Sequence, residues 1–168
     1  MLTIYFRNSG VLLALLREAN TARSVTDIFD DLYIKLGSKT FRSLFPVILT
    51  DRGSEFSNPN ALEFDGEGNR RTQIFYCDAN APYQKGGIEV AHEFIRKVIP
   101  KGNSMNHFGQ EDISLMINHI NSYGRKKLNN RSASQSFSFL YGDDVLAKLD
   151  AHHIEPNSII LTPKLLKK

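Results

Sequence analysis

The stretch "ILTDRGSEF", residues 48–56, sets an apolar run directly before an aspartate and a glycine. The run from Val47 to Leu49 predicts a buried strand, because aliphatic residues follow a proline and precede turn residues. Gly53 allows a sharp turn where a side chain would clash. Asp51 therefore lies at the end of a strand, where a carboxylate is costly to bury unless it is paired or binds a metal ion.

Composition limits what surrounds this stretch. A chain of 168 residues with 41% hydrophobic residues can bury one core, so a single domain is the default. The net charge is +3, and seven basic residues lie in "IRKVIPKG" (95–102) and "GRKKLNNR" (124–131). Such runs usually form a solvated face, and in some proteins they bind phosphates, which favours an anionic partner here.

The single cysteine, Cys77, excludes an internal disulfide framework and fits a reducing cytoplasm. No apolar run approaches the length of a membrane span, and the N-terminus shows no signal-peptide pattern. We therefore expect a soluble intracellular chain without a membrane partner.

The N-terminal residues predict a β-hairpin. "LTIYF" (2–6) and "VLLALL" (11–16) are apolar runs of strand length, joined by "RNSG". The second run is also compatible with a helical turn, since leucine and alanine are good helix formers, but the short polar joint favours the hairpin. We expect "VILT" (47–50) to join the hairpin in one sheet, followed by a turn at 64–71 and a strand at 72–76.

Helices are expected around this sheet. Ser24 is predicted to cap the first, which carries apolar residues at helical spacing and ends at Gly37. A second begins near Ile88 and ends before Pro100, and a third runs from about Glu111 to Tyr123 with an apolar stripe of Ile113, Met116, Ile117 and Ile120. Shorter helices are expected within 134–149. This order predicts a mixed α/β chain around one sheet.

A second carboxylate, Glu89, falls in the first turn of the helix that follows "YQKGG". By itself a glutamate there only complements the helix dipole, and Glu93 with Arg96 is expected to form an exposed polar face. Considered together with an aspartate at a strand end, Glu89 becomes a candidate metal ligand, because Mg²⁺ binds a few carboxylates that converge from separate elements. Two such ions can hold the attacking and leaving oxygens of a phosphodiester in line.

These residues together resemble a known family. "ILTDRGSEF" followed by "YQKGGIEVAHEFIRKVIPKG" (83–102) is similar to the catalytic core of bacterial DDE insertion-sequence transposases of family thirty, which resembles retroviral integrases and ribonuclease H. The family pattern is a strand ending in TD-x-G-x-EF, then a glutamate, "IR" and "PKG". It places the aspartate on Asp51 and the glutamate, counted back from "PKG", on Glu89. "INHINSYGRKKLNN" (117–130) is similar to the closing helix and basic segment of the family.

The resemblance implies a ribonuclease H-like fold, a mixed sheet flanked by helices, with the catalytic core in 1–130 and a C-terminal helical extension in 131–168. It implies that Asp51 and Glu89 bind Mg²⁺ or Mn²⁺, with two ions in an intact member. The implied partners are DNA, as transposon ends and as target, and a second copy of the chain, at the bacterial nucleoid. The candidate phosphate contacts are Lys85, Arg96, Lys97 and Lys101.

The sequence also departs from the family pattern. Arg52 and Val90 stand where the family usually has asparagine, and "NNRSASQ" (129–135) replaces a serine-proline helix start. The first acidic residue of the chain is Glu18. We therefore expect the strand that carries the first catalytic aspartate, and the N-terminal helix-turn-helix region that binds DNA ends, to be missing.

Two functions follow as hypotheses. The first is a Mg²⁺-dependent enzyme that nicks transposon ends and joins them to target DNA, with water and then a 3′-hydroxyl attacking phosphorus. The second is a truncated, non-catalytic chain that only binds DNA or associates with full-length transposase.

Overall fold

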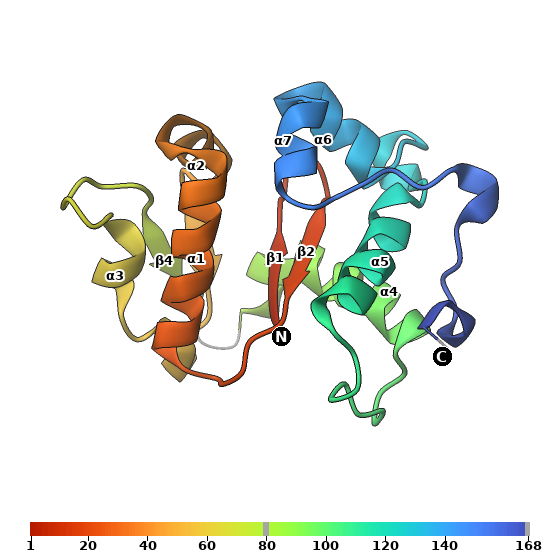
Figure 1. Ribbon diagram of the computed structural model, residues 1–168, viewed down its shortest axis with the longest axis horizontal. Coiled ribbons are helices and arrows are strands. Elements are labelled where there is room, and N and C mark those ends of the chain that lie inside the picture. The colour runs from red at the N-terminus through yellow and green to blue at the C-terminus, as the bar shows by residue number, and fades with distance from the viewer. Residues whose placement is uncertain (79–80, 167–168) are drawn as a thin grey trace. The chain divides into compact units, whose positions relative to one another are not determined.

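The computed structural model describes residues 1–78 and 81–166, apart from the side chain of Pro82, and its architecture is mixed α/β (Figure 1). The chain forms two compact units. Met1–Leu16 and Gly86–Lys168 make up what we call the discontinuous unit, and Arg17–Lys85 make up the inserted unit. None of the helices in the described part of the chain is long and apolar enough to cross a membrane.

The discontinuous unit begins with the predicted hairpin. Strands β1 (Leu2–Tyr5) and β2 (Leu12–Leu15) pair antiparallel, with Leu2 opposite Leu15 and Tyr5 opposite Leu12. Gly10 has a φ of 78° in the turn, a value that few residues other than glycine adopt readily. The hairpin prediction is confirmed, and the helical alternative for residues 11–16 is wrong.

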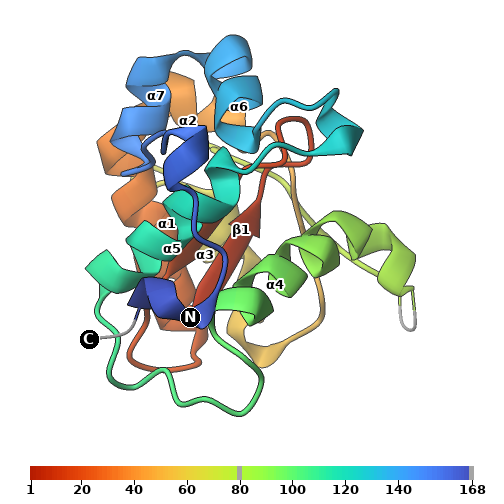
Figure 2. The same ribbon diagram turned by 90° about the vertical axis from the view of Figure 1, so that its right-hand side faces the viewer.

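Two long helices of the discontinuous unit pack on the hairpin (Figure 2). Helix α4 spans Gly86–Val98 and helix α5 spans Gln110–Ser122, close to the predicted limits. The predicted α5 stripe is buried as expected. The core that these elements share consists of Leu12, Ala14, Ala91, Ile95, Val98, Ile99, Ile113, Met116, Ile117, Ile120 and Leu166.

Side chains of α5 occupy the edge of β2 that β1 leaves open. The Asn121 amide accepts from the Leu12 N–H at 2.9 Å and donates to the Leu12 carbonyl at 2.8 Å. Gln110 accepts from the Leu16 N–H at 2.8 Å and donates to the carbonyl of Ala14 at 3.0 Å. Gln110 and Asn121 lie about three helical turns apart, on one face. These two amides satisfy backbone groups that a neighbouring strand would otherwise satisfy.

The C-terminal part of this unit is helical, as predicted. Helix α6 (Ala133–Tyr141) begins at Ser132, whose hydroxyl accepts from the Gln135 N–H at 3.1 Å, and α7 (Asp143–Lys148) follows. Short 3₁₀ turns cover η3 (Lys126–Leu128), η4 (Pro156–Ser158) and η5 (Pro163–Leu166). The division of the chain at residue 130 stays a prediction.

The inserted unit opens with α1 (Ala22–Leu36) and α2 (Ser38–Leu44). The predicted cap at Ser24 is wrong by one turn: Thr21 is the cap, and its side chain accepts from the Ser24 N–H at 3.2 Å. Gly37 ends α1 with a φ of 78°, as predicted. The apolar side of α1 packs on α2 through edge-to-face aromatic contacts, with ring centroids of Phe29 and Phe41 6.4 Å apart.

The strands of the inserted unit form a sheet of their own. β3 (Ile48–Thr50) pairs parallel with β4 (Ile74–Tyr76), and no ladder among the described residues joins this pair to β1 or β2. The predicted single mixed sheet is therefore replaced by two two-stranded sheets. The prediction that the run before Asp51 is buried is also wrong, because Val47 and Leu49 are 51% and 44% exposed. β3 alternates between an exposed and a covered face, as a strand covered on one side does.

A buried arginine holds the chain between α3 (Pro59–Glu63) and β4. Residues 64–71 turn as predicted, and Arg71 returns from that turn into the interior with its side chain 1% exposed. Its guanidinium donates to the carbonyls of Leu62 and Ala61, both at 2.9 Å, and forms an ion pair with Asp30 on α1 at 2.6 Å. The same guanidinium lies over the Phe41 ring of α2, so one side chain joins three helices.

Candidate functional site

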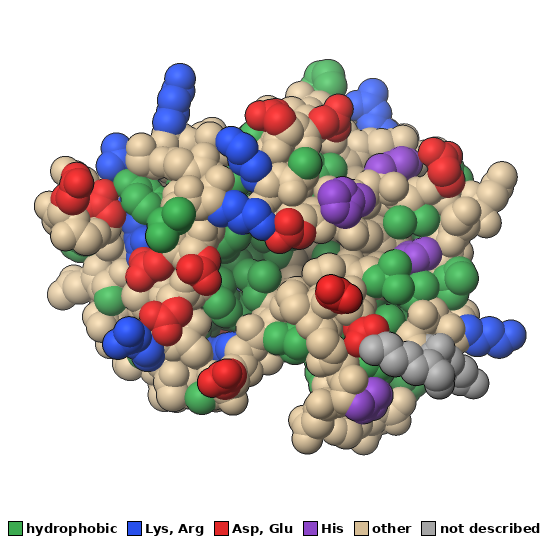
Figure 3. Space-filling view, in the orientation of Figure 1, with side chains coloured by type: hydrophobic (Ala, Val, Ile, Leu, Met, Phe, Trp, Pro, Cys, Tyr) green, Lys and Arg blue, Asp and Glu red, His purple; other side chains and the backbone are tan. Residues whose placement is uncertain are grey.

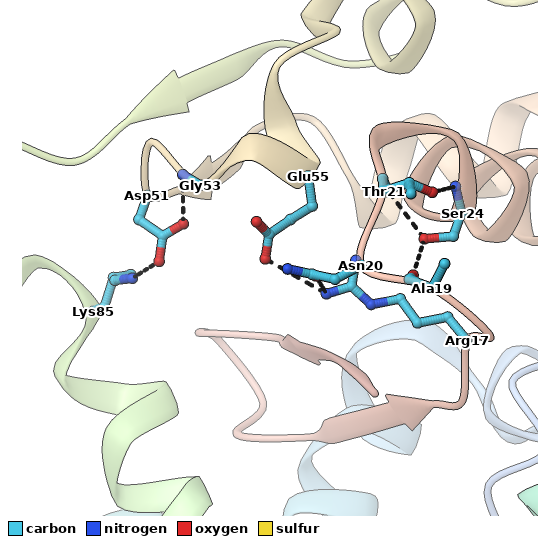
Figure 4. A network of polar contacts seen from close by, with 9 residues as sticks. All are labelled: Arg17, Ala19, Asn20, Thr21, Ser24, Asp51, Gly53, Glu55 and Lys85. Carbon is cyan, nitrogen blue, oxygen red and sulfur yellow. Dashed lines mark hydrogen bonds and ion pairs between the residues drawn. The ribbon is translucent and has the colours of Figure 1, made fainter.

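Asp51 is the first residue after β3, and its carboxylate is held by two partners (Figure 4). Oδ1 accepts from the backbone N–H of Gly53 at 3.1 Å, and Oδ2 pairs with Nζ of Lys85 at 2.8 Å. Lys85 ends the 3₁₀ turn η2 (Pro82–Lys85) within the same unit. The Asp51 side chain is 57% exposed, so a ligand from solvent can reach it.

These partners favour the ionised form of the carboxylate. The hydrogen bond from the Lys85 ammonium, supported by the Gly53 N–H, lowers the pKa of Asp51 below its ordinary value. A metal ligand must be deprotonated, so Asp51 is ready to coordinate a cation at neutral pH. Before a cation can bind Oδ2, it has to displace the Lys85 ammonium.

Gly53 provides space between two carboxylates. Its φ of −60° and ψ of 149° are values that any residue adopts, so the expected reason for glycine, a sharp turn, is wrong. A Cβ at this position would collide with the Glu55 carboxylate and would lie 3.1 Å from Oδ1 of Asp51. The 3₁₀ turn η1 (Ser54–Phe56) brings Glu55 back toward Gly53, so the two carboxylates flank the glycine (Figure 4).

Glu55 was not among the sequence-predicted site residues. Its Oε1 lies 3.5 Å from Nη2 of Arg17, which also donates to the side chain of Asn20 (Figure 4). The TD-x-G-x-EF pattern did contain this glutamate, four residues after the aspartate. One tight turn between the two residues is enough to bring their carboxylates to the same neighbourhood. Glu55 therefore adds a second carboxylate to the neighbourhood of Asp51 within the inserted unit.

Glu89 belongs to the discontinuous unit. It is exposed in the first turn of α4, where a carboxylate complements the helix dipole. Glu93, one turn later, forms an exposed ion pair with Arg96, as the sequence predicted. Glu89 is thus the accessible acid of this helix, and Glu93 is the paired one.

The four predicted phosphate contacts differ in their surroundings. Lys85 pairs with Asp51, and Arg96 pairs with Glu93. Nζ of Lys97 lies 4.8 Å from the centroid of the Phe94 ring, a cation–π contact. Lys101 is exposed after the end of α4.

The donor chemistry of the candidate residues suits a hard cation. Mg²⁺ and Mn²⁺ prefer carboxylate oxygens, and Asp51 and Glu89 each offer an accessible carboxylate. Within 1–78 and 81–166, no three side chains of His, Cys, Asp or Glu lie close enough to hold a metal ion together.

Comparison with known proteins gives related sequences. The chain is 36% identical over 120 residues, 71% of its length, to a protein named as integrase ORF3 of Spiroplasma virus SpV1-R8A2 B. It is 27% identical over 126 residues, 75% of its length, to the transposase InsI for insertion sequence element IS30C of Escherichia coli K12. Over 63 residues, 38% of its length, it is 30% identical to the transposase for insertion sequence element IS1086 of Cupriavidus metallidurans.

The matches cover only part of each relative. They extend over 35% of the Spiroplasma virus protein, 31% of the IS30C transposase and 19% of the IS1086 transposase, so the chain spans about a third or less of their lengths. No protein-family model matches the chain, and no solved structure matches it significantly.

Proposed function

This chain belongs to the family of integrases and insertion-sequence transposases, and from that premise we propose that it acts in cutting and joining DNA at the ends of an insertion sequence. The observation that supports the proposal most directly is the turn after β3. There the TD-x-G-x-EF residues present Asp51 ionised and exposed at a strand end. A carboxylate of this kind is a ligand for a divalent ion.

The proposal assigns a metal-binding role to Asp51 and Glu89 together. A divalent ion bound to these carboxylates would polarise a phosphodiester and activate the attacking oxygen. Asp51 and Glu89 would hold the ion, while Lys85, Arg96, Lys97 and Lys101 would contact phosphates of the DNA. Lys85 has two roles in this scheme, because its ammonium neutralises Asp51 until a cation binds and is then released toward a phosphate.

The proposal also assigns a ribonuclease H-like fold to the chain. An antiparallel hairpin, a parallel strand pair and surrounding helices are compatible with a ribonuclease H-like arrangement. In this proposal residues 1–130 carry the catalytic core and residues 131–168 form a helical extension.

Mn²⁺ binding tests whether Asp51 and Glu89 share an ion. We expect Asp51→Asn and Glu89→Gln each to weaken Mn²⁺ binding by at least about 10- to 100-fold, the loss typical when a metal site loses a supporting residue. Because both would hold the same ion, the double variant should lose little more than either single variant. Isothermal titration of the purified chain with MnCl₂ measures this.

Glu93→Gln is the matched control, since Glu93 lies one turn along the same helix and is already paired with Arg96. It should bind Mn²⁺ like the wild type, and losses that simply add in the double variant would contradict a shared ion. Plasmid nicking in Mg²⁺ or Mn²⁺ then separates the two hypotheses. Nicking that Asp51→Asn abolishes identifies an enzyme, whereas Mn²⁺ binding without nicking identifies the non-catalytic chain of the second hypothesis.

Lys85→Gln should raise the affinity for Mn²⁺ by about two- to fivefold. The ammonium of Lys85 competes with the cation for Oδ2 of Asp51, and a partly exposed ion pair of this kind is worth up to about 1 kcal/mol. The same titration measures the change, with Lys101→Gln as a control that removes an equal charge elsewhere. Weaker Mn²⁺ binding by Lys85→Gln would show that the ammonium does not compete with the ion.

A further inference from the structure

The loop between α5 and α6, residues 124–131, gathers cations in a stretch without acids. We call it the basic loop; it contains Arg125, Lys126, Lys127 and Arg131. The sequence has no aspartate or glutamate between Asp112 and Asp143. Lys126, Lys127 and Arg131 are exposed, and within the described residues no carboxylate pairs with any of the three. The positive charge of this loop is therefore available to an external anion.

Arg125 has a different role from the other three cations, because it fixes the loop to the discontinuous unit. Its guanidinium donates to the carbonyls of Gly10 at 2.9 Å and Ile120 at 3.2 Å. The backbone that follows α5 lies beside the turn of the hairpin (Figure 2). It also lies 5.1 Å from the centroid of the Phe94 ring. Burial lowers the pKa of Arg125, yet the group stays charged at neutral pH.

The backbone of the basic loop is closed on itself. The Arg125 N–H donates to the Arg131 carbonyl, and the Asn130 N–H donates to the Arg125 carbonyl, both at 3.0 Å. Asn129 and Asn130 both adopt the left-handed conformation, with φ of 53° and 63°. Asparagine tolerates this conformation better than most residues. The three exposed cations are thus carried by a defined loop, which reduces the entropy lost when they bind.

Two of the four phosphate contacts predicted from the sequence already have an acidic partner: Lys85 and Arg96 pair with carboxylates. Lys97 and, in the basic loop, Arg131 each lie over an aromatic ring, with the Arg131 guanidinium 5.9 Å from the centroid of the Phe139 ring. The face that Figure 3 shows carries both Lys and Arg side chains and Asp and Glu side chains. The basic loop differs from these positions because its exposed cations have no acidic neighbour in the sequence.

We propose that Lys126, Lys127 and Arg131 of the basic loop bind the phosphate backbone of DNA without reading its sequence. The inference rests on the proposed function and adds a contact surface that the four predicted phosphate contacts do not include. Exposed lysine and arginine side chains bind phosphates through charge, with release of counterions, and such contacts carry no base specificity. Three contacts should contribute about 2.7 to the slope of log affinity against log salt concentration.

Fluorescence anisotropy with a labelled DNA duplex of random sequence tests the proposal on the full chain. The variant Lys126→Gln/Lys127→Gln/Arg131→Gln should lower the salt slope by about 2.7 and the affinity at 100 mM salt by at least about tenfold. Lys39→Gln/Lys148→Gln/Lys164→Gln removes the same net charge from exposed positions elsewhere and should keep most of the slope.

The outcomes separate this inference from the proposed function. If the wild type binds with a steep salt slope and both triple variants behave alike, the basic loop is not a contact surface, whereas DNA binding by the chain stands. If the wild type does not bind DNA at all, both the inference and the DNA-binding part of the proposed function are overturned. A lower slope in the basic-loop variant alone, with the melting temperature unchanged, supports the assignment.

Discussion

Arg71→Met is expected to destabilise the inserted unit by about 3–5 kcal/mol, because it removes a buried cation that holds three elements together. The guanidinium donates to two carbonyls at the end of α3, and each hydrogen bond from a charged donor is worth about 1.5–3 kcal/mol. It also lies 5.4 Å from the centroid of the Tyr33 ring and 5.8 Å from that of Phe41. Methionine fills part of the volume but satisfies neither carbonyl.

The neighbouring arginine is a matched control for this prediction. Arg70 is half exposed and pairs with Glu63 at 3.8 Å, so Arg70→Met should cost less than about 1 kcal/mol. Equal losses for Arg70→Met and Arg71→Met would refute a specific role for Arg71.

Native-state hydrogen exchange is the suitable measurement, because a chain with two compact units need not unfold in one step. Exchange of amides in α1 should speed up in Arg71→Met, since Asp30 on α1 loses its partner. Amides of α5 in the discontinuous unit report separately whether the effect stays in the inserted unit.

Asn121→Leu should destabilise the discontinuous unit by about 2–5 kcal/mol. The Asn121 side chain is buried, and its amide satisfies both the N–H and the carbonyl of Leu12, a residue that is fully buried as well. Leucine has the same branching at Cγ but is larger, so the loss combines two buried backbone groups left without partners with overpacking of a buried position. Each such group costs about 1–3 kcal/mol.

Gln110→Leu provides the graded comparison. Gln110 makes the same kind of contact with β2 at the exposed end of α5, where water can replace the amide. Its loss should therefore cost about 1 kcal/mol or less. Hydrogen exchange of the Leu12 amide should speed up strongly in Asn121→Leu and only slightly in Gln110→Leu, and the opposite order would contradict this account of the β2 edge.

Local sequence patterns were sufficient to predict those features of the fold that depend on residues close together in the chain. The hairpin, the end of α1 at Gly37 and the apolar stripe of α5 all follow from spacing along the chain. The cap of α1 shows where such patterns fail. Ser24 and Thr21 are both good capping residues, and the structure uses Thr21, while the Ser24 hydroxyl donates to the carbonyls of Ala19 and Thr21.

For the candidate site, too, some features could be predicted from the sequence and others could not. The motif by itself indicated Asp51 as a carboxylate at a strand end. It did not show that Lys85 pairs with that carboxylate, because the two residues are far apart in the sequence. It also contained Glu55, whose approach to Gly53 depends on the conformation of a single tight turn. Asp51 and Glu89 as joint metal ligands remain a proposal that the Mn²⁺ titrations test.

Patterns along the chain were enough to indicate the family, the hairpin and the helices α1, α4 and α5 with their buried faces, because these depend on residues close together in the chain. They did not indicate α2 or α3. How polar groups are satisfied in the interior became clear only from the fold. Arg71 lies in a polar segment and Asn121 is a polar residue beside the apolar stripe of α5, yet both are buried. Both hydrogen-bond to backbone groups, which every residue carries and which leave no mark in a sequence, and Arg71 also pairs with Asp30.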